Sequence, residues 1–145
     1  MHPTRKTRNI TGSFNKYLQA ILPSVKFNFG EAEFETAPLN RWVQVDYISR
    51  TLSVKMDLIC QLSFYAKDDR FGTKAEDLCD QVLDQLYNDP GDNNQKSIPM
   101  QDWFDVSKPV VGGIWIRPRQ VNKPVVDQYG VTNLVVTLEL KISRV

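Results

Sequence analysis

The chain has 145 residues, a length that suits one domain, and its 41% hydrophobic and 24% charged residues are ordinary for a folded domain. Disorder and a membrane-spanning protein are therefore both disfavoured. Eighteen Lys and Arg residues against 17 Asp and Glu residues give a net charge of +1, so any electrostatic role must be local.

Residue types that serve common enzyme mechanisms are scarce. The chain has one histidine, His2, and two cysteines, Cys60 and Cys79. These are too few for a structural zinc site. Because the one histidine is at the start of the chain, no histidine is left elsewhere to form a Ser-His or Cys-His nucleophile pair. The pair Gly112-Gly113 lacks the Lys and Ser/Thr that follow in a phosphate-binding loop. We therefore expect a protein that is not an enzyme and has no catalytic, metal-binding or cofactor-binding residues.

The start of the chain, residues 1–9, is polar and basic, and we expect a flexible arm there, followed by one domain over residues 10–145. Contact with an anionic partner is an alternative role for this arm, but a solvated terminus is the simpler interpretation. No apolar run has the length of a signal peptide core or a bilayer span. We expect assembly in a cytoplasm, reduced cysteines and no membrane partner.

The first helix is predicted by apolar residues at i, i+3, i+4, i+7 and i+8 over residues 14–22. Thr11 or Ser13 can cap its first N–H groups, and Pro23 should end it because proline cannot continue a helix.

The second helix is predicted to begin at Thr73, because Glu76 follows three residues later in the pattern of a capping box. Its apolar stripe includes Cys79, and Cys60 lies on the apolar face of a predicted strand, so both thiols should be small core residues. The opposite face is acidic, and we expect it to be a solvated surface formed by Glu76, Asp77, Asp80 and Asp84.

Strands are predicted wherever apolar and polar residues alternate, with polar loops at 31–40 and 88–97. The longest strand should follow its predecessor through a hairpin link at 49–52, and its extra length could form an arm against another subunit. Pro118 predicts a sheet edge or a strand end. The predicted strands are residues 25–29, 41–48, 53–67, 100–104, 112–118 and 132–145.

The resulting order is one helix, three strands, one helix and three strands. Strands joined by hairpins, with a helix at the start and another midway, predict an α+β fold. We expect a mainly antiparallel β-sheet with both helices packed on one face.

Trp115, Arg117 and Arg119 are predicted to share one face of a strand, opposite two isoleucines. Exposed tryptophan and arginine are typical of protein interfaces, which is the interpretation we favour. An ordinary outer sheet face and stacking on single-stranded nucleic acid are the alternatives. Trp42 is a second aromatic out of phase with its strand. The candidate interface residues are Trp42, Arg50, Trp115, Arg117 and Arg119.

In its size and in the order of its elements, the chain resembles the tail terminators of tailed bacteriophages, a family also called tail completion or minor tail proteins. The resemblance extends over residues 10–144 and rests on the whole pattern. It is carried by the opening helix FNKYLQAIL, the hairpin RWVQVDYISRTLSVKMDLICQLSFYAK, the helix KAEDLCDQVLDQLYN, the loop NDPGDNNQKS and the closing strands GGIWIRPRQV and TNLVVTLELKISRV.

The resemblance implies a structural virion protein of the tail or neck that forms a hexameric ring. One face of the ring would cap the tail tube protein and stop its polymerisation, and the other would receive a head-tail connector protein. Genomic DNA would pass through the hole without sequence-specific binding, and near-neutral charge suits such a passage. The family has no motif that assigns interface residues to this chain.

Two alternatives stay open at this point. Another head-tail joining protein of the neck differs little from a terminator at the level of sequence. A small nucleic-acid-binding module would instead use Trp115, Arg117 and Arg119 together with the basic arm.

Overall fold

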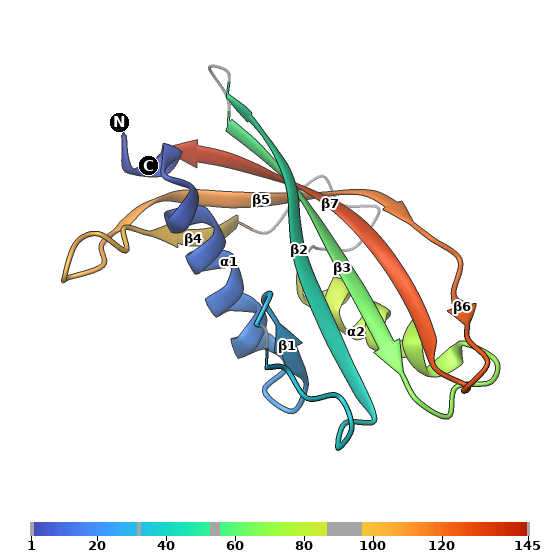
Figure 1. The fold of residues 1–145 in the computed structure, drawn as a ribbon. Helices are drawn as coiled ribbons and strands as arrows, with labels where there is room; N and C mark the ends of the chain where they lie inside the picture. Colours follow the sequence, from blue (N-terminus) through green and yellow to red (C-terminus); the bar gives the residue numbers. More distant parts are fainter. Residues whose placement is uncertain (1, 32, 53–55, 87–96, 145) are drawn as a thin grey trace.

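The computed structural model describes residues 2–31, 33–52, 56–86 and 97–144 (Figure 1). The described strands form one seven-stranded sheet in the order β1-β2-β3-β7-β5-β4, with β6 paired to β7. All described strand pairs are antiparallel except β1 with β2. The elements are a 3-10 helix (Pro3–Arg5), α1 (Thr7–Ile21), β1 (Lys26–Asn28), β2 (Arg41–Leu52), β3 (Met56–Ala66), α2 (Thr73–Leu86), β4 (Ser97–Gln101), β5 (Val110–Val121), β6 (Val125–Val126) and β7 (Thr132–Arg144).

Both α-helices lie on the inner side of the curved sheet (Figure 1), as the sequence predicts for an α+β fold. Alternate residues of β3 and β7 point inward, so that Leu62 pairs with Val136 and Phe64 with Leu134. These side chains are buried and join the apolar faces of α1 and α2 in one core. The single core explains why one face of every long strand is apolar.

Both cysteines belong to this core, as predicted. Burial, with a smaller contribution from the Asp46 carboxylate, raises the pKa of Cys60 far above its ordinary value. Burial also raises the pKa of Cys79 to about 12, with Asp80 and Glu76 adding to the shift. Both thiols therefore stay protonated and unreactive at neutral pH.

The prediction for the hairpin is wrong in one respect, because residues 49–52 belong to β2. Ile48 is an extra residue between two register pairs, Tyr47 with Cys60 and Ser49 with Ile59. This bulge interrupts the alternation in the sequence without ending the strand. Residues 53–55, predicted as the start of the next strand, lie outside the described residues, and β3 begins at Met56.

Most of the extra strand length of β3 is used within this sheet. From Asp57 to Ala66, β3 is paired with β2 on one side and with β7 on the other. A strand with two partners satisfies its backbone groups within the chain. The length of β3 therefore contributes to this sheet, and contact of the β2–β3 hairpin with another subunit stays a prediction.

The structure differs from the predicted flexible arm at residues 1–9. Pro3–Arg5 form a 3-10 helix, and α1 already begins at Thr7. The side chains of Thr4 and Asn9 are buried. Their hydrogen bonds within the chain compensate for the burial of polar groups, which the composition of the segment does not reveal.

Because α1 starts early, the predicted caps Thr11 and Ser13 lie inside the helix. The N-cap residue is Lys6, whose side chain makes no capping bond. The Thr11 hydroxyl donates to the carbonyl of Thr7 at 3.2 Å, which is a bond within the helix. The other end agrees with the prediction, since the helix ends at Ile21 ahead of Pro23.

Of the strands predicted after α2, β5 contains the predicted range and β7 begins at Thr132 as predicted, whereas β4 is displaced. Residues 88–96 of the predicted loop lie outside the described residues. β4 covers Ser97–Gln101 because Ile98 and Met100 are the residues that reach the core. β4 pairs with β5 only as far as Trp115, so the rest of β5 has β7 as its sheet partner. Pro118 therefore lies on an edge, as predicted. None of the helices in the described ranges is long and apolar enough to cross a membrane.

Candidate interaction surfaces

The outer face of the sheet carries two of the candidate interface residues in the predicted arrangement. Trp115 and Arg117 lie on the same face of β5, paired with Lys141 and Glu139 of β7. Trp115 is half-buried, and its indole Nε1 donates to the Ser143 hydroxyl at 3.0 Å. Arg117 is exposed and lies across from a carboxylate. The face is thus a polar outer surface that carries charges of both signs.

Arg119 is separated from this pair by a bulge. The register moves from Pro118 with Leu138 directly to Gln120 with Thr137, so Arg119 is an unpaired extra residue. It is exposed at the sheet edge. The two-residue period that places Trp115 and Arg117 on one face is therefore interrupted at Arg119, and a shared face for Arg119 stays a prediction.

Trp42 and Arg50 lie elsewhere. Trp42 is only 8% exposed and stacks on Tyr65 with ring centroids 5.1 Å apart. Lys67 Nζ lies 5.7 Å from the Trp42 ring. Arg50 is exposed on the helix side of the sheet, where its guanidinium donates to the Thr7 hydroxyl. The candidate interface residues therefore do not form one patch.

The acidic face of α2 is exposed as predicted, along Glu76, Asp77, Asp80 and Asp84. The start of α2 differs from the predicted capping box. Thr73 is the first helical residue, and Asp69 accepts from the N–H groups of Lys74 at 2.9 Å and Ala75 at 3.0 Å. The buried Asp69 carboxylate therefore caps α2, in place of the paired Thr73 and Glu76 side-chain bonds of the predicted capping box.

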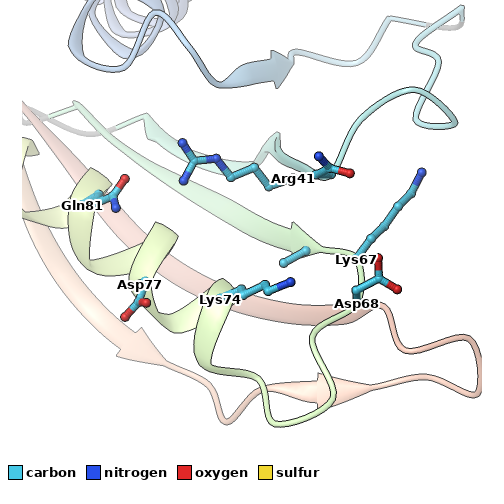
Figure 2. A pocket seen from close by; sticks show the side chains of 8 residues that line it. Arg41, Lys67, Asp68, Lys74, Asp77 and Gln81 are labelled. Atoms are coloured by element: carbon cyan, nitrogen blue, oxygen red, sulfur yellow. The ribbon is translucent and has the colours of Figure 1, made fainter.

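A polar pocket of about 370 Å³ lies between the start of β2, the end of β3 and α2 (Figure 2). Its charged lining consists of Arg41, Lys67 and Lys74 with Asp68 and Asp77. The Lys67 ammonium already donates to two backbone carbonyls, at 2.8 and 2.9 Å. Charges of both signs line an open recess, so the pocket has no clear preference for an anion or a cation.

A basic, partly apolar surface lies where the β4–β5 loop meets the start of α1. We call it the basic end and define it by Lys6, Arg8, Phe104, Val106 and Lys108. Phe104 is 56% exposed, and Val106 is fully exposed. Lys6 Nζ lies 4.3 Å from the centroid of the Phe104 ring and Arg8 Cζ lies 5.7 Å from it. Exposed apolar groups rimmed by charge are typical of interaction sites.

A second surface runs from the loop before α2 along the exposed face of that helix. We call it the acidic end and define it by Phe71, Glu76, Asp77, Asp80 and Asp84. Phe71 is 81% exposed, and the four carboxylate side chains are exposed on the helix that follows it. Figure 1 places the loop before α2 and the β4–β5 loop at opposite ends of the molecule. Further exposed apolar residues near the first of these loops are Val125, Val126 and Tyr129.

The basic end is held together by Asn9, which sequence analysis assigned to a flexible arm. The Asn9 side chain donates to the Pro3 carbonyl at 2.9 Å and to the Asp102 carboxylate at 3.2 Å. It also accepts from the backbone N–H of Trp103 at 2.8 Å. One buried amide thus joins the 3-10 helix, α1 and the β4–β5 loop. The sequence carries no local signal for this role, because two of the three bonds join Asn9 to residues more than 90 positions away along the chain.

We predict that Asn9→Ala lowers the free energy of unfolding by about 2 kcal/mol, because buried polar groups lose their partners. Chemical denaturation monitored by tryptophan fluorescence would measure the change. Gln19→Ala, on an exposed position of the same helix, is the matched control and should change stability by less than about 0.5 kcal/mol. Equal effects of the two substitutions would contradict the assigned role of Asn9.

Within the part of the chain that the structure describes, no group of three or more His, Cys, Asp or Glu side chains is arranged to hold a metal ion. No protein-family model and no curated protein matches the chain.

Solved structures do match it. One, which carries a serial designation and no functional name, superposes with a TM-score of 0.63 at 12% identity, covering 97% of this chain and 98% of that chain. A match to the virion of a native gene transfer agent particle has a TM-score of 0.44 at 13% identity and covers 86% of this chain and 83% of that chain. The first match shows that the whole chain adopts a fold found in another protein.

Proposed function

We propose that this protein is a structural component of a tailed-phage virion, a tail terminator that acts by assembly and not by catalysis. In this role it forms a hexameric ring, caps the tail tube and provides the docking surface for a head-tail connector protein, while genomic DNA passes through the ring. The number six, the tube and the connector come from the resemblance of the whole sequence to the tail terminators.

The observation that carries the proposal is a pair of unlike surfaces, each with an exposed aromatic ring. One lies at the β4–β5 loop and the start of α1, and the other lies along α2 and the loop before it. Phe104 marks the basic end and Phe71 the acidic end. When two different surfaces of a chain meet, the contact is head-to-tail, and such contacts generate a ring if the rotation closes. An arrangement of this kind supports a subunit that assembles with copies of itself.

The sheet edges favour association through side chains over addition of strands. Beyond Gln44, the outer edge of β2 has no described strand partner, and this stretch contains the Ile48 bulge. The free edge of β5 carries Pro118 and the bulge at Arg119. Bulges, prolines and charged residues on an edge protect it from pairing with another chain.

Light scattering of the purified protein tests the ring, and we expect a species with the mass of several subunits. A strictly monomeric protein, even in the presence of its tail tube protein, would contradict the proposal. Electron micrographs of particles lacking the protein test its role. Overlong or uncapped tails are expected for a terminator, whereas finished tails without heads would indicate another head-tail joining protein.

A further inference from the structure

The two ends of the molecule have opposite charge as well as exposed aromatic rings. The basic end has Lys6, Arg8 and Lys108, with Asp102 and Asp105 as opposing charges in the same loop. The Asp105 carboxylate accepts from the N–H and hydroxyl of Ser107 at 3.0 and 2.8 Å, and these bonds favour its charged form. Three cations against two carboxylates still leave this surface with a positive net charge.

The acidic end has four exposed carboxylates on one helix, with Arg70 and Lys74 as neighbouring positive charges. Arg70 Cζ lies 5.7 Å from the centroid of the Phe71 ring, and four carboxylates against two cations leave this surface with a negative net charge. In the described part of the chain, Lys74 donates its backbone N–H to Asp69, while its side chain lines the polar pocket (Figure 2). The carboxylates of Asp80 and Asp84 lie further along α2, on its exposed face. They are one turn apart and form a strip of negative charge.

We infer that the basic end of one copy of this chain docks on the acidic end of a second copy, with Phe104 and Phe71 contributing the apolar centre of the contact. Lys6, Arg8 and Lys108 then face the carboxylates of α2. This inference rests on the self-association in the proposed function, but not on what the assembly caps. Complementary charge guides such a contact and fixes its register.

The charge pattern also selects the symmetry of the contact. In a two-fold dimer each surface meets its own copy, so basic would face basic or acidic would face acidic. Like charges placed across an interface cost free energy. A head-to-tail contact pairs unlike charges. An open chain of such contacts has one unpaired surface at each end, and closure into a ring pairs these two surfaces with each other.

A charge swap tests this contact. Asp80→Lys with Asp84→Lys makes both ends basic, and Lys6→Glu with Arg8→Glu makes both ends acidic. We expect each double variant to associate at least about tenfold more weakly than the unmodified chain, because like charges then face each other. The quadruple variant carries both changes and should recover most of the association. Light scattering over a range of protein concentrations at low salt gives the comparison.

Glu33→Lys with Glu35→Lys is the matched control, since it makes the same charge change at exposed residues of the β1–β2 loop. It should associate as the unmodified chain does. Equal weakening by the control, or a quadruple variant no better than either double variant, would overturn the inference. Circular dichroism of each variant shows that loss of association is not loss of folding.

Cysteine cross-linking gives a second measurement. The variant Arg8→Cys with Asp80→Cys should form a ladder of disulfide-linked oligomers under mild oxidation, because both native thiols are buried. Arg8→Cys alone should form none. A dimer from the single variant would show two-fold contacts and overturn the head-to-tail arrangement. A correct ladder from a protein that does not cap tubes would overturn only the proposed function.

Discussion

Replacing Gly112 with alanine is expected to lower the free energy of unfolding by about 3 kcal/mol, among the larger effects of adding a single methyl group. A Cβ at this position would lie 2.2 Å from the backbone oxygen of Ser143 on β7. It would also lie 2.9 Å from Thr4 Cγ2 and 3.2 Å from Met100 Cε. The first contact is with backbone, so a side-chain rotation cannot relieve it and β5 must separate locally from β7.

Urea denaturation followed by far-ultraviolet circular dichroism measures this effect. The matched control is Val121→Ala, on an exposed position of the same strand, which should change stability by less than about 1 kcal/mol. The Thr4 contact adds a second readout, because strain at Gly112 should also loosen the 3-10 helix and weaken self-association through the basic end. A Gly112→Ala protein as stable as the control would show that the strands are further apart than described.

Replacing Asp69 with asparagine is expected to lower the free energy of unfolding by about 2 kcal/mol at neutral pH. Burial by itself raises the pKa of Asp69, but the N–H groups of Lys74 and Ala75 lower it more, so the pKa lies below its ordinary value. An asparagine keeps one acceptor oxygen and turns an amide donor toward the other N–H. The substitution therefore removes the charge and leaves one of the two helix N–H groups unpaired.

The same pKa shift predicts how this stabilisation depends on pH. The unfolded Asp69 binds its proton with an ordinary pKa of about 4, and the folded one only at lower pH. The stabilisation is therefore complete above about pH 4 and is lost as pH falls through the folded pKa. Denaturation at pH 7 and pH 3 should show the difference between Asp69→Asn and the unmodified protein shrinking at the lower pH. Asp80→Asn, on the exposed face, is the control and should show no such change.

Much of the fold could be predicted from sequence because it depends on local period. The alternation in β3 and β7 and the stripe of α2 identify the residues that form the core, whatever the partners are. The boundaries were less predictable. The bulge at Ile48 interrupts the alternation of apolar and polar residues, so the sequence does not predict the last part of β2 as strand. The burial of Asn9 depends on partners in the β4–β5 loop, which are distant in the sequence.

The candidate interface was only partly predictable, for a related reason. Trp115 and Arg117 share a face as the two-residue period requires, but a bulge at Arg119 interrupts this period. Trp42 is covered by Tyr65, which is its register partner on the neighbouring strand. Periodicity gives the face on which a residue lies, but only the pairing of strands gives what covers it.

By itself, the sequence determined the inward face of each long strand, the two amphipathic helices, the acidic face of α2 and the inert, buried thiols, since all of these follow from the spacing of apolar residues along the chain. Only the tertiary structure decided that Asp69 caps α2, that Asn9 anchors the first residues and that the loops with the exposed Phe104 and Phe71 lie at opposite ends of the molecule. These features arise from groups that are distant in sequence or from loops without periodicity, and their positions are set by packing in three dimensions.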